Sequence, residues 1–128
     1  MTNELEKQFF STFGIEPNCK FVKYCDDCTK CGCYHYPRIT DSILLELEAI
    51  IHNEYNVLVY EKFMDSIKIT AYPMYDNLPC DPAYFTVMAQ ADNKREALLV
   101  LAMDINVQHY IKQQVRTLFE EGQDEYFD

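Results

Sequence analysis

The chain has 128 residues, of which 48% are apolar, and this length and composition predict one compact domain and exclude a large multidomain enzyme. Its 11 basic and 21 acidic residues leave a formal net charge of −10, which argues against a sequence-independent binder of duplex nucleic acid. No apolar run is long enough to span a membrane and no secretory signal is recognisable, so we expect a cytoplasmic protein.

Residues 3–13 predict the first helix. Asn3 is a suitable N-cap, and Gly14 can end the helix in the left-handed conformation, with Ile15 folding back onto Phe10. The apolar residues fall on one stripe, which consists of Leu5, Phe9, Phe10 and Phe13.

Residues 16–38 contain most of the cysteines and show no hydrophobic period, so they predict a loop. The second helix begins after Thr40, a good N-cap residue. Its apolar residues repeat at helical spacing and are Ile43, Leu44, Leu47, Ile50 and Ile51.

Three segments rich in β-branched and aromatic residues follow, at residues 55–61, 67–72 and 83–90. The connections between them are too short for parallel crossovers. The sequence therefore predicts an antiparallel meander of three strands.

The last third of the chain predicts two helices. Asn93 begins the first of them, and residues 97–105 are apolar nearly all round, which indicates a helix at the centre of the core. We expect a break at Asn106 and a further helix ending at Gly122. The stripe predicted for this last helix comprises Val107, Tyr110, Ile111, Val115, Leu118 and Phe119.

Together these elements predict an α+β fold: a small antiparallel three-stranded sheet packed on one face by about four helices, with a cysteine-rich loop of zinc-binding type. Residues 1–122 would form the single domain, including the loop 16–38. The acidic tail 123–128 is expected to be frayed.

The cysteine loop contains the most specific chemical pattern in the chain. Four of the six cysteines lie within nine residues, and clustered thiols in a reducing compartment are typical metal ligands. Two-residue gaps let one turn present two sulfurs to a tetrahedral zinc ion. The predicted ligands are Cys25, Cys28, Cys31 and Cys33, with Cys19 or His35 as substitutes. A zinc ion with four protein ligands has no open position, so this site would be structural.

Other states of these thiols stay open at this point: free or redox-active thiols, an iron–sulfur cluster, and disulfides. The sixth cysteine, Cys80, stands alone between two prolines and beside Asp81. Because a neighbouring carboxylate disfavours the thiolate, we interpret Cys80 as a packed loop thiol and not as a nucleophile.

Three segments, FFSTFGIEP, YPRITDSILLELEAI and IKQQVRTLFEEG, resemble a group of small proteins encoded by phages and prophages of low-GC Gram-positive bacteria. The resemblance covers about residues 8–52 and 107–122. It implies a phage-borne accessory protein that works in the cytoplasm of the host cell.

We therefore expect a non-catalytic, zinc-stapled acidic module that binds a host or phage protein. In a phage, such a module would inhibit a bacterial defence or nucleic-acid-processing enzyme in the manner of anti-CRISPR proteins, with carboxylates placed where the target expects phosphates. Tyrosines in loops and at strand ends would serve as interface anchors. They are Tyr24, Tyr34, Tyr36, Tyr72, Tyr75 and Tyr84.

Two alternatives come from other classes of protein. A regulator that binds nucleic acid would use the basic residues of the cysteine loop on phosphates and its tyrosines on bases. These residues are Lys20, Lys23, Lys30 and Arg38, with Tyr24, Tyr34 or Tyr36. A small-ligand-binding protein or enzyme would instead need a cleft built from Asp76, Cys80 and Asp81.

Overall fold

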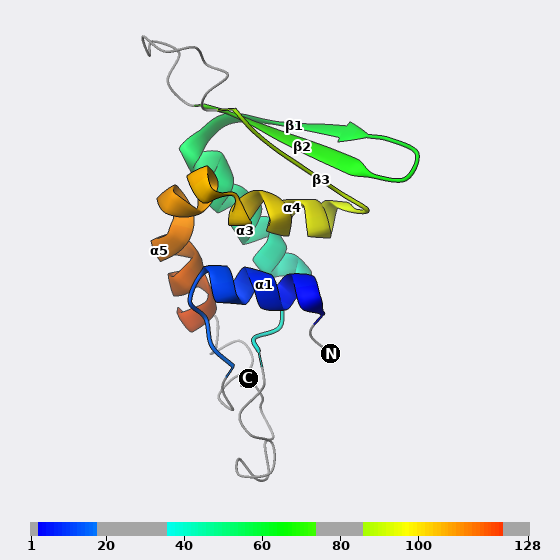
Figure 1. Ribbon diagram of the computed structural model, residues 1–128. Coiled ribbons are helices and arrows are strands. Elements are labelled where there is room, and N and C mark those ends of the chain that lie inside the picture. The colour runs from blue at the N-terminus through cyan, green and yellow to red at the C-terminus, as the bar shows by residue number, and fades with distance from the viewer. Residues whose placement is uncertain (1–2, 18–35, 74–85, 122–128) are drawn as a thin grey trace.

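The computed structural model describes residues 3–17, 36–73 and 86–121, which form two layers, one of helices and one of strands (Figure 1). The α+β class and the antiparallel three-stranded sheet are as the sequence predicts. The elements in chain order are α1 (Glu4–Thr12), α3 (Asp41–Glu54), β1 (Tyr55–Lys62), β2 (Ile67–Pro73), β3 (Val87–Ala91), α4 (Lys94–Met103) and α5 (Ile105–Glu121).

Helix α1 begins and ends at the residues expected from sequence. The Asn3 side-chain oxygen accepts a hydrogen bond of 2.8 Å from the Glu6 backbone N–H. At the other end Gly14 has a φ of 70°, and the Ile15 N–H donates to the Phe10 carbonyl at 2.8 Å. This pattern satisfies a helix-end carbonyl that would otherwise lack a partner.

The second helix, α3, is also capped as predicted, because the Thr40 hydroxyl accepts a hydrogen bond from the Ile43 N–H at 3.3 Å. It buries Ile43, Leu47 and Ile51, which are spaced by four residues and therefore share one face. The chain then passes directly into β1.

The three strands form a sheet of order β1-β2-β3 in which both pairs are antiparallel. Val57 lies opposite Tyr72, and Met88 lies opposite Thr70. The third strand starts at Val87, later than the predicted residue 83, and ends at Ala91. Residues 83–85 lie outside the described residues, and Thr86 is described but is not part of the strand.

Helices α4 and α5 are separate, but the predicted position of the break is wrong. The break lies at Asp104, whose backbone leaves the helical conformation at ψ 136°. The Asp104 carboxylate then accepts a hydrogen bond of 2.9 Å from the Asn106 N–H, so Asp104 caps α5 and Asn106 is already helical.

Helix α5 buries Val107, Ile111, Val115 and Phe119. Tyr110 was also predicted on this stripe, which is wrong, since its side chain is 54% exposed. Residues spaced by four lie almost above one another on a helix, and Tyr110 points to the side of that line.

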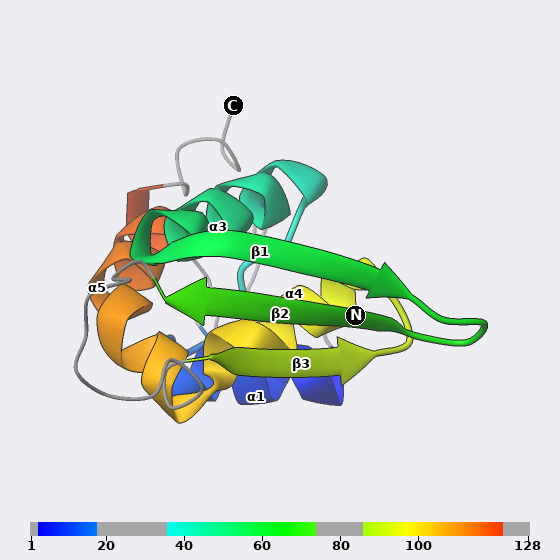
Figure 2. The ribbon, with the colours of Figure 1, turned by 90° about the horizontal axis from the view of Figure 1, so that it is seen from above.

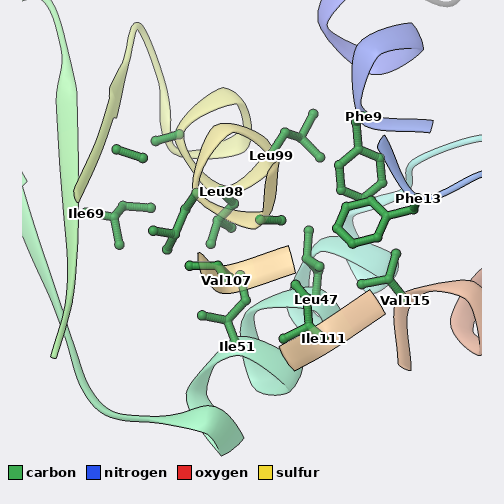
Figure 3. Close-up of a cluster of buried hydrophobic side chains, with 14 of the residues drawn as sticks. Phe9, Phe13, Leu47, Ile51, Ile69, Leu98, Leu99, Val107, Ile111 and Val115 are labelled. Carbon is green, nitrogen blue, oxygen red and sulfur yellow. The ribbon is translucent and has the colours of Figure 1, made fainter. Parts of the chain in front are cut away.

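Helix α4 lies against the sheet, between it and α1 (Figure 1). It contacts β2 and β3 on one side and α1, α3 and α5 on the other. As the sequence predicts, it is central to the core, with five buried residues: Ala97, Leu98, Leu99, Leu101 and Ala102. Figure 3 shows Leu98 and Leu99 between Ile69 of the sheet and the side chains of α1, α3 and α5.

Candidate functional site

The predicted zinc ligands lie outside the described residues. This holds for Cys25, Cys28, Cys31 and Cys33, for the substitutes Cys19 and His35, and for Cys80. Within residues 3–17, 36–73 and 86–121, no three His, Cys, Asp or Glu side chains are grouped so that they could hold a metal ion. The zinc site therefore stays a prediction from the cysteine spacing.

The described residues on either side of the cysteine segment both contact Phe10. Ile15 donates its backbone N–H to the Phe10 carbonyl, as described above. Tyr36 stacks on the Phe10 ring with a centroid distance of 5.2 Å and an interplanar angle of 10°. The described residues before and after the cysteine loop are therefore both held against Phe10 of α1. Because Phe10 covers one face of the Tyr36 ring, a nucleic-acid base cannot stack on that face.

The face of the sheet that points away from the helices carries a group of apolar side chains. Side chains alternate between the two faces of a strand, so the burial of Ile69 and Ala71 against the helices places Thr70 and Tyr72 on the opposite face. Their cross-strand partners lie on that face too. We call this surface the outer face and define it by Val57, Val59, Thr70, Tyr72 and Met88.

No described element covers the outer face, and Figures 1 and 2 place all the helices on the other side of the sheet. Val57 and Tyr72 are each 43% exposed and Met88 is 60% exposed. Thr70, in the central strand, is only 4% exposed. Val57 lies directly opposite Tyr72, and Met88, which pairs with Thr70, is diagonal to Tyr72 across the next strand pair. These exposed apolar side chains are therefore neighbours, which is typical of a binding surface.

The β1–β2 hairpin extends past the helices (Figure 2). Its connection consists of four residues, and the Phe63 N–H donates to the Ser66 carbonyl at 2.8 Å. Phe63 is 46% exposed and Met64 is fully exposed. The Gln90 side-chain amide of β3 donates to the Ser66 hydroxyl at 2.8 Å and so holds the hairpin connection to the third strand.

A second group of side chains joins α3, β1 and α4. The Tyr60 hydroxyl donates a hydrogen bond to the Glu48 carboxylate, and the Lys94 ammonium lies 3.2 Å from the same carboxylate. Burial, and secondly the hydrogen bond and charge of Glu48, raise the pKa of Tyr60 above its ordinary value. Lys94 also lies 5.0 Å from the centre of the Tyr60 ring, at a distance typical of a cation–π contact.

These three residues border a shallow, open hollow of about 580 Å³. The other residues around it are Leu45, Ala49, His52, Asn53 and Leu58. Because the Glu48 carboxylate already has two partners, this group works as a connection between three elements more readily than as a catalytic centre.

Among the site residues, sequence reasoning singled out Tyr72 but missed Phe63, Met64 and Met88. A signal for the first two is present, since a connection between strands is normally built from polar residues and glycine. No protein-family model, curated protein or solved structure matches the chain. Within the described residues, no helix combines the length and the apolar character needed to cross a membrane.

Proposed function

We propose that this chain is a non-catalytic protein-binding module that docks on a basic protein partner through the outer face of its sheet. The observation that carries the proposal is the apolar surface formed by Val57, Tyr72 and Met88 on three adjacent strands, which no described element covers. Tyr and Met are enriched at the centres of protein interfaces, where they bury large apolar areas.

The charge of the chain supports a basic partner. At a formal charge of −10, the molecule attracts a positively charged protein over long range and repels acidic ones. Enzymes that process nucleic acids carry such positive surfaces because they contact phosphates. The resemblance to phage-encoded proteins points the same way, to inhibition of a bacterial defence or nucleic-acid-processing enzyme in the host cytoplasm.

We further propose that a structural zinc ion holds the cysteine segment, with Cys25, Cys28, Cys31 and Cys33 as ligands and Cys19 or His35 as substitutes. The spacing of the cysteines supports this, as does the contact of both flanking residues, Ile15 and Tyr36, with Phe10. Because both ends of the cysteine loop are held at one place, metal binding has to overcome a smaller entropic cost of ordering the loop.

Elemental analysis of protein purified without added metal tests the zinc proposal. We expect about one equivalent of zinc in the wild type, as a four-thiolate structural site requires, and a clear loss in the Cys28→Ser variant. The matched control is Cys80→Ser, which lies outside the cluster and should keep the metal. A wild-type zinc content well under half an equivalent, or equal loss in both variants, would contradict the proposal.

The docking proposal is tested in two steps. A tagged full-length chain first captures proteins from a lysate of a low-GC Gram-positive bacterium, and each captured protein is identified and purified. Titration calorimetry then measures its affinity for the wild type and for the double variant Tyr72→Ser/Met88→Ser. Loss of two central anchors should weaken binding by about 10- to 100-fold.

The matched control is Tyr110→Ser, which removes an exposed tyrosine from α5, away from the outer face. Its affinity should equal that of the wild type. If no purified protein binds the chain, or if the outer-face variant binds as tightly as the control, the docking proposal is wrong. Retardation of an oligonucleotide at low salt would favour the nucleic-acid alternative instead.

A further inference from the structure

The connection of the β1–β2 hairpin exposes two large apolar side chains at its end. Met64 is fully exposed and Phe63 is half exposed, while the residues from Glu61 to Asp65 are all at the surface. We call Phe63 and Met64 the hairpin tip. The connection between β1 and β2, to which they belong, lies beyond the edge of the helical layer in Figures 1 and 2.

A hairpin connection does not require large apolar side chains. A short connection is formed well by polar residues and glycine, which place no apolar surface in water. Met64 is fully exposed and Phe63 is 46% exposed, in contrast to the fully buried Phe9, Phe10 and Phe13 of α1. Apolar side chains at an exposed turn are explained more readily by binding than by stability.

We infer that the hairpin tip inserts Phe63 and Met64 into an apolar pocket of the same basic protein partner. The inference rests on the proposed docking function and deepens it by naming the anchor residues and the shape of the partner surface. A projecting tip fits a concave surface, and an aromatic side chain in a desolvated pocket is the typical form of an energetic anchor.

The hairpin is held in shape before it binds. The Phe63–Ser66 backbone hydrogen bond closes the connection, and the Gln90–Ser66 side-chain bond ties it to β3. A rigid connection loses less conformational entropy on insertion than a flexible loop does. From Val57 to Phe63 the chain spans about 20 Å of strand, so the tip and the outer face can meet one protein partner together.

A lipid surface is the first alternative, and the charges oppose it. The chain has a formal charge of −10, and the residues flanking the tip do not form a basic patch, since Glu61 and Asp65 balance Lys62 and Lys68. An anionic membrane repels such a molecule. Two apolar side chains also bury less surface than one myristoyl chain, which itself gives only marginal membrane binding.

A second copy of the chain is the other alternative. Helices α3 and α4 border a mainly apolar hollow of about 320 Å³ near Leu44, Leu45 and Leu98, which a tip from another molecule could enter. Such a head-to-tail contact forms a closed ring only if its rotation closes, and otherwise leads to open assemblies. It would also bring two strongly acidic molecules together. A different, basic protein is therefore the occupant that the observations favour.

The test uses the full chain and the double variant Phe63→Ser/Met64→Ser. With the partner purified as described above, we expect the tip variant to bind at least about tenfold more weakly. The variant should still unfold cooperatively, with only a small fall in melting temperature, because Met64 is fully exposed and Phe63 is about half exposed. The matched control is Asp65→Ser, a polar residue in the same connection, which should bind like the wild type.

The other occupants give different results. Flotation with phosphatidylglycerol vesicles tests the lipid alternative, and sedimentation of the chain alone tests self-association. Flotation of the wild type that the tip variant loses, or an assembly larger than a monomer that the tip variant dissolves, would overturn the inference. Equal partner affinity of the tip variant and the wild type would overturn it too, while leaving the outer-face proposal intact. If no purified protein binds the wild type, both proposals are wrong.

Discussion

The fold raises the pKa of two phenol groups in β1, those of Tyr55 and Tyr60. Tyr55 is buried, and its surroundings raise its pKa to about 12. Burial is the main cause, and the nearby Asp104 carboxylate adds to it. Tyr60 is shifted in the same direction by burial and by Glu48. Both phenols stay protonated in the folded protein at a pH where those of the unfolded chain ionise.

The shift of Tyr55 predicts a loss of stability in alkaline solution. Its folded-state pKa lies above the unfolded value of 10.0, so the stabilisation is complete below pH 10 and is lost as the pH rises toward 12. A difference of two units corresponds to about 3 kcal/mol in the free energy of unfolding. The variant Tyr55→Phe, which has no phenol to ionise, should therefore lose less stability than the wild type between pH 9 and pH 11.

Urea unfolding at several pH values in this range measures the effect. The matched control is Tyr72→Phe, which removes a phenol from the exposed outer face and should follow the wild-type curve. Identical pH dependence in the wild type and in Tyr55→Phe would show that Tyr55 does not govern the alkaline transition.

At the scale of elements, aromatic side chains join the first and the last described helix, α1 and α5, in the core. The centroid of the Phe119 ring of α5 lies 5.9 Å from that of Phe9 and 5.3 Å from that of Phe10 of α1. Both pairs of rings meet edge to face. All three side chains are buried. Helix α5 therefore holds α1, and with it the residues that flank the cysteine segment.

Truncation of this contact should be strongly destabilising. We expect Phe119→Ala to lower the free energy of unfolding by about 3–5 kcal/mol, because it removes a large buried ring and leaves a cavity. Tyr110→Ala, on the exposed side of the same helix, should change it by less than about 0.5 kcal/mol. Denaturant unfolding measures both, and equal effects of the two substitutions would contradict the packing described for α5.

The helix caps and the buried stripes could be predicted from sequence because they depend on residues within one or two turns. Asn3, Thr40 and Asn93 each accept a hydrogen bond from the backbone three residues on, as their types and positions indicate. The break before α5 was placed wrongly at Asn106, because Asn and Asp are both capable caps and the packing of α4 decides between them.

Less of the candidate site could be predicted. The order of the elements predicts helices on one face of the sheet, but which of the alternating strand residues point away from those helices depends on tertiary packing. The exposure of Met88 and the meeting of Glu48, Tyr60 and Lys94 therefore became visible only in the fold. The cysteine ligands lie outside the described residues, so the zinc site stays a prediction.

At the scale of the whole molecule, the fold has two faces with different roles. The helical layer buries the core on one side of the sheet, while the outer face exposes apolar side chains on the other. Under the proposed function, the strongly acidic chain approaches a basic partner by charge, and the apolar sheet face that no described element covers then makes the contact.

Hydroxyl-radical footprinting tests this claim most directly, because it compares the exposure of each side chain in the free chain and in the complex with the purified partner. We predict that Met88 and Tyr72 of the outer face are oxidised about tenfold more slowly in the complex, as expected for the buried centre of an interface. Leu45 and Tyr110, exposed on the helical layer, should react at the same rate in both states. Protection of Leu45 and Tyr110, with Met88 and Tyr72 oxidised as fast as in the free chain, would contradict the account.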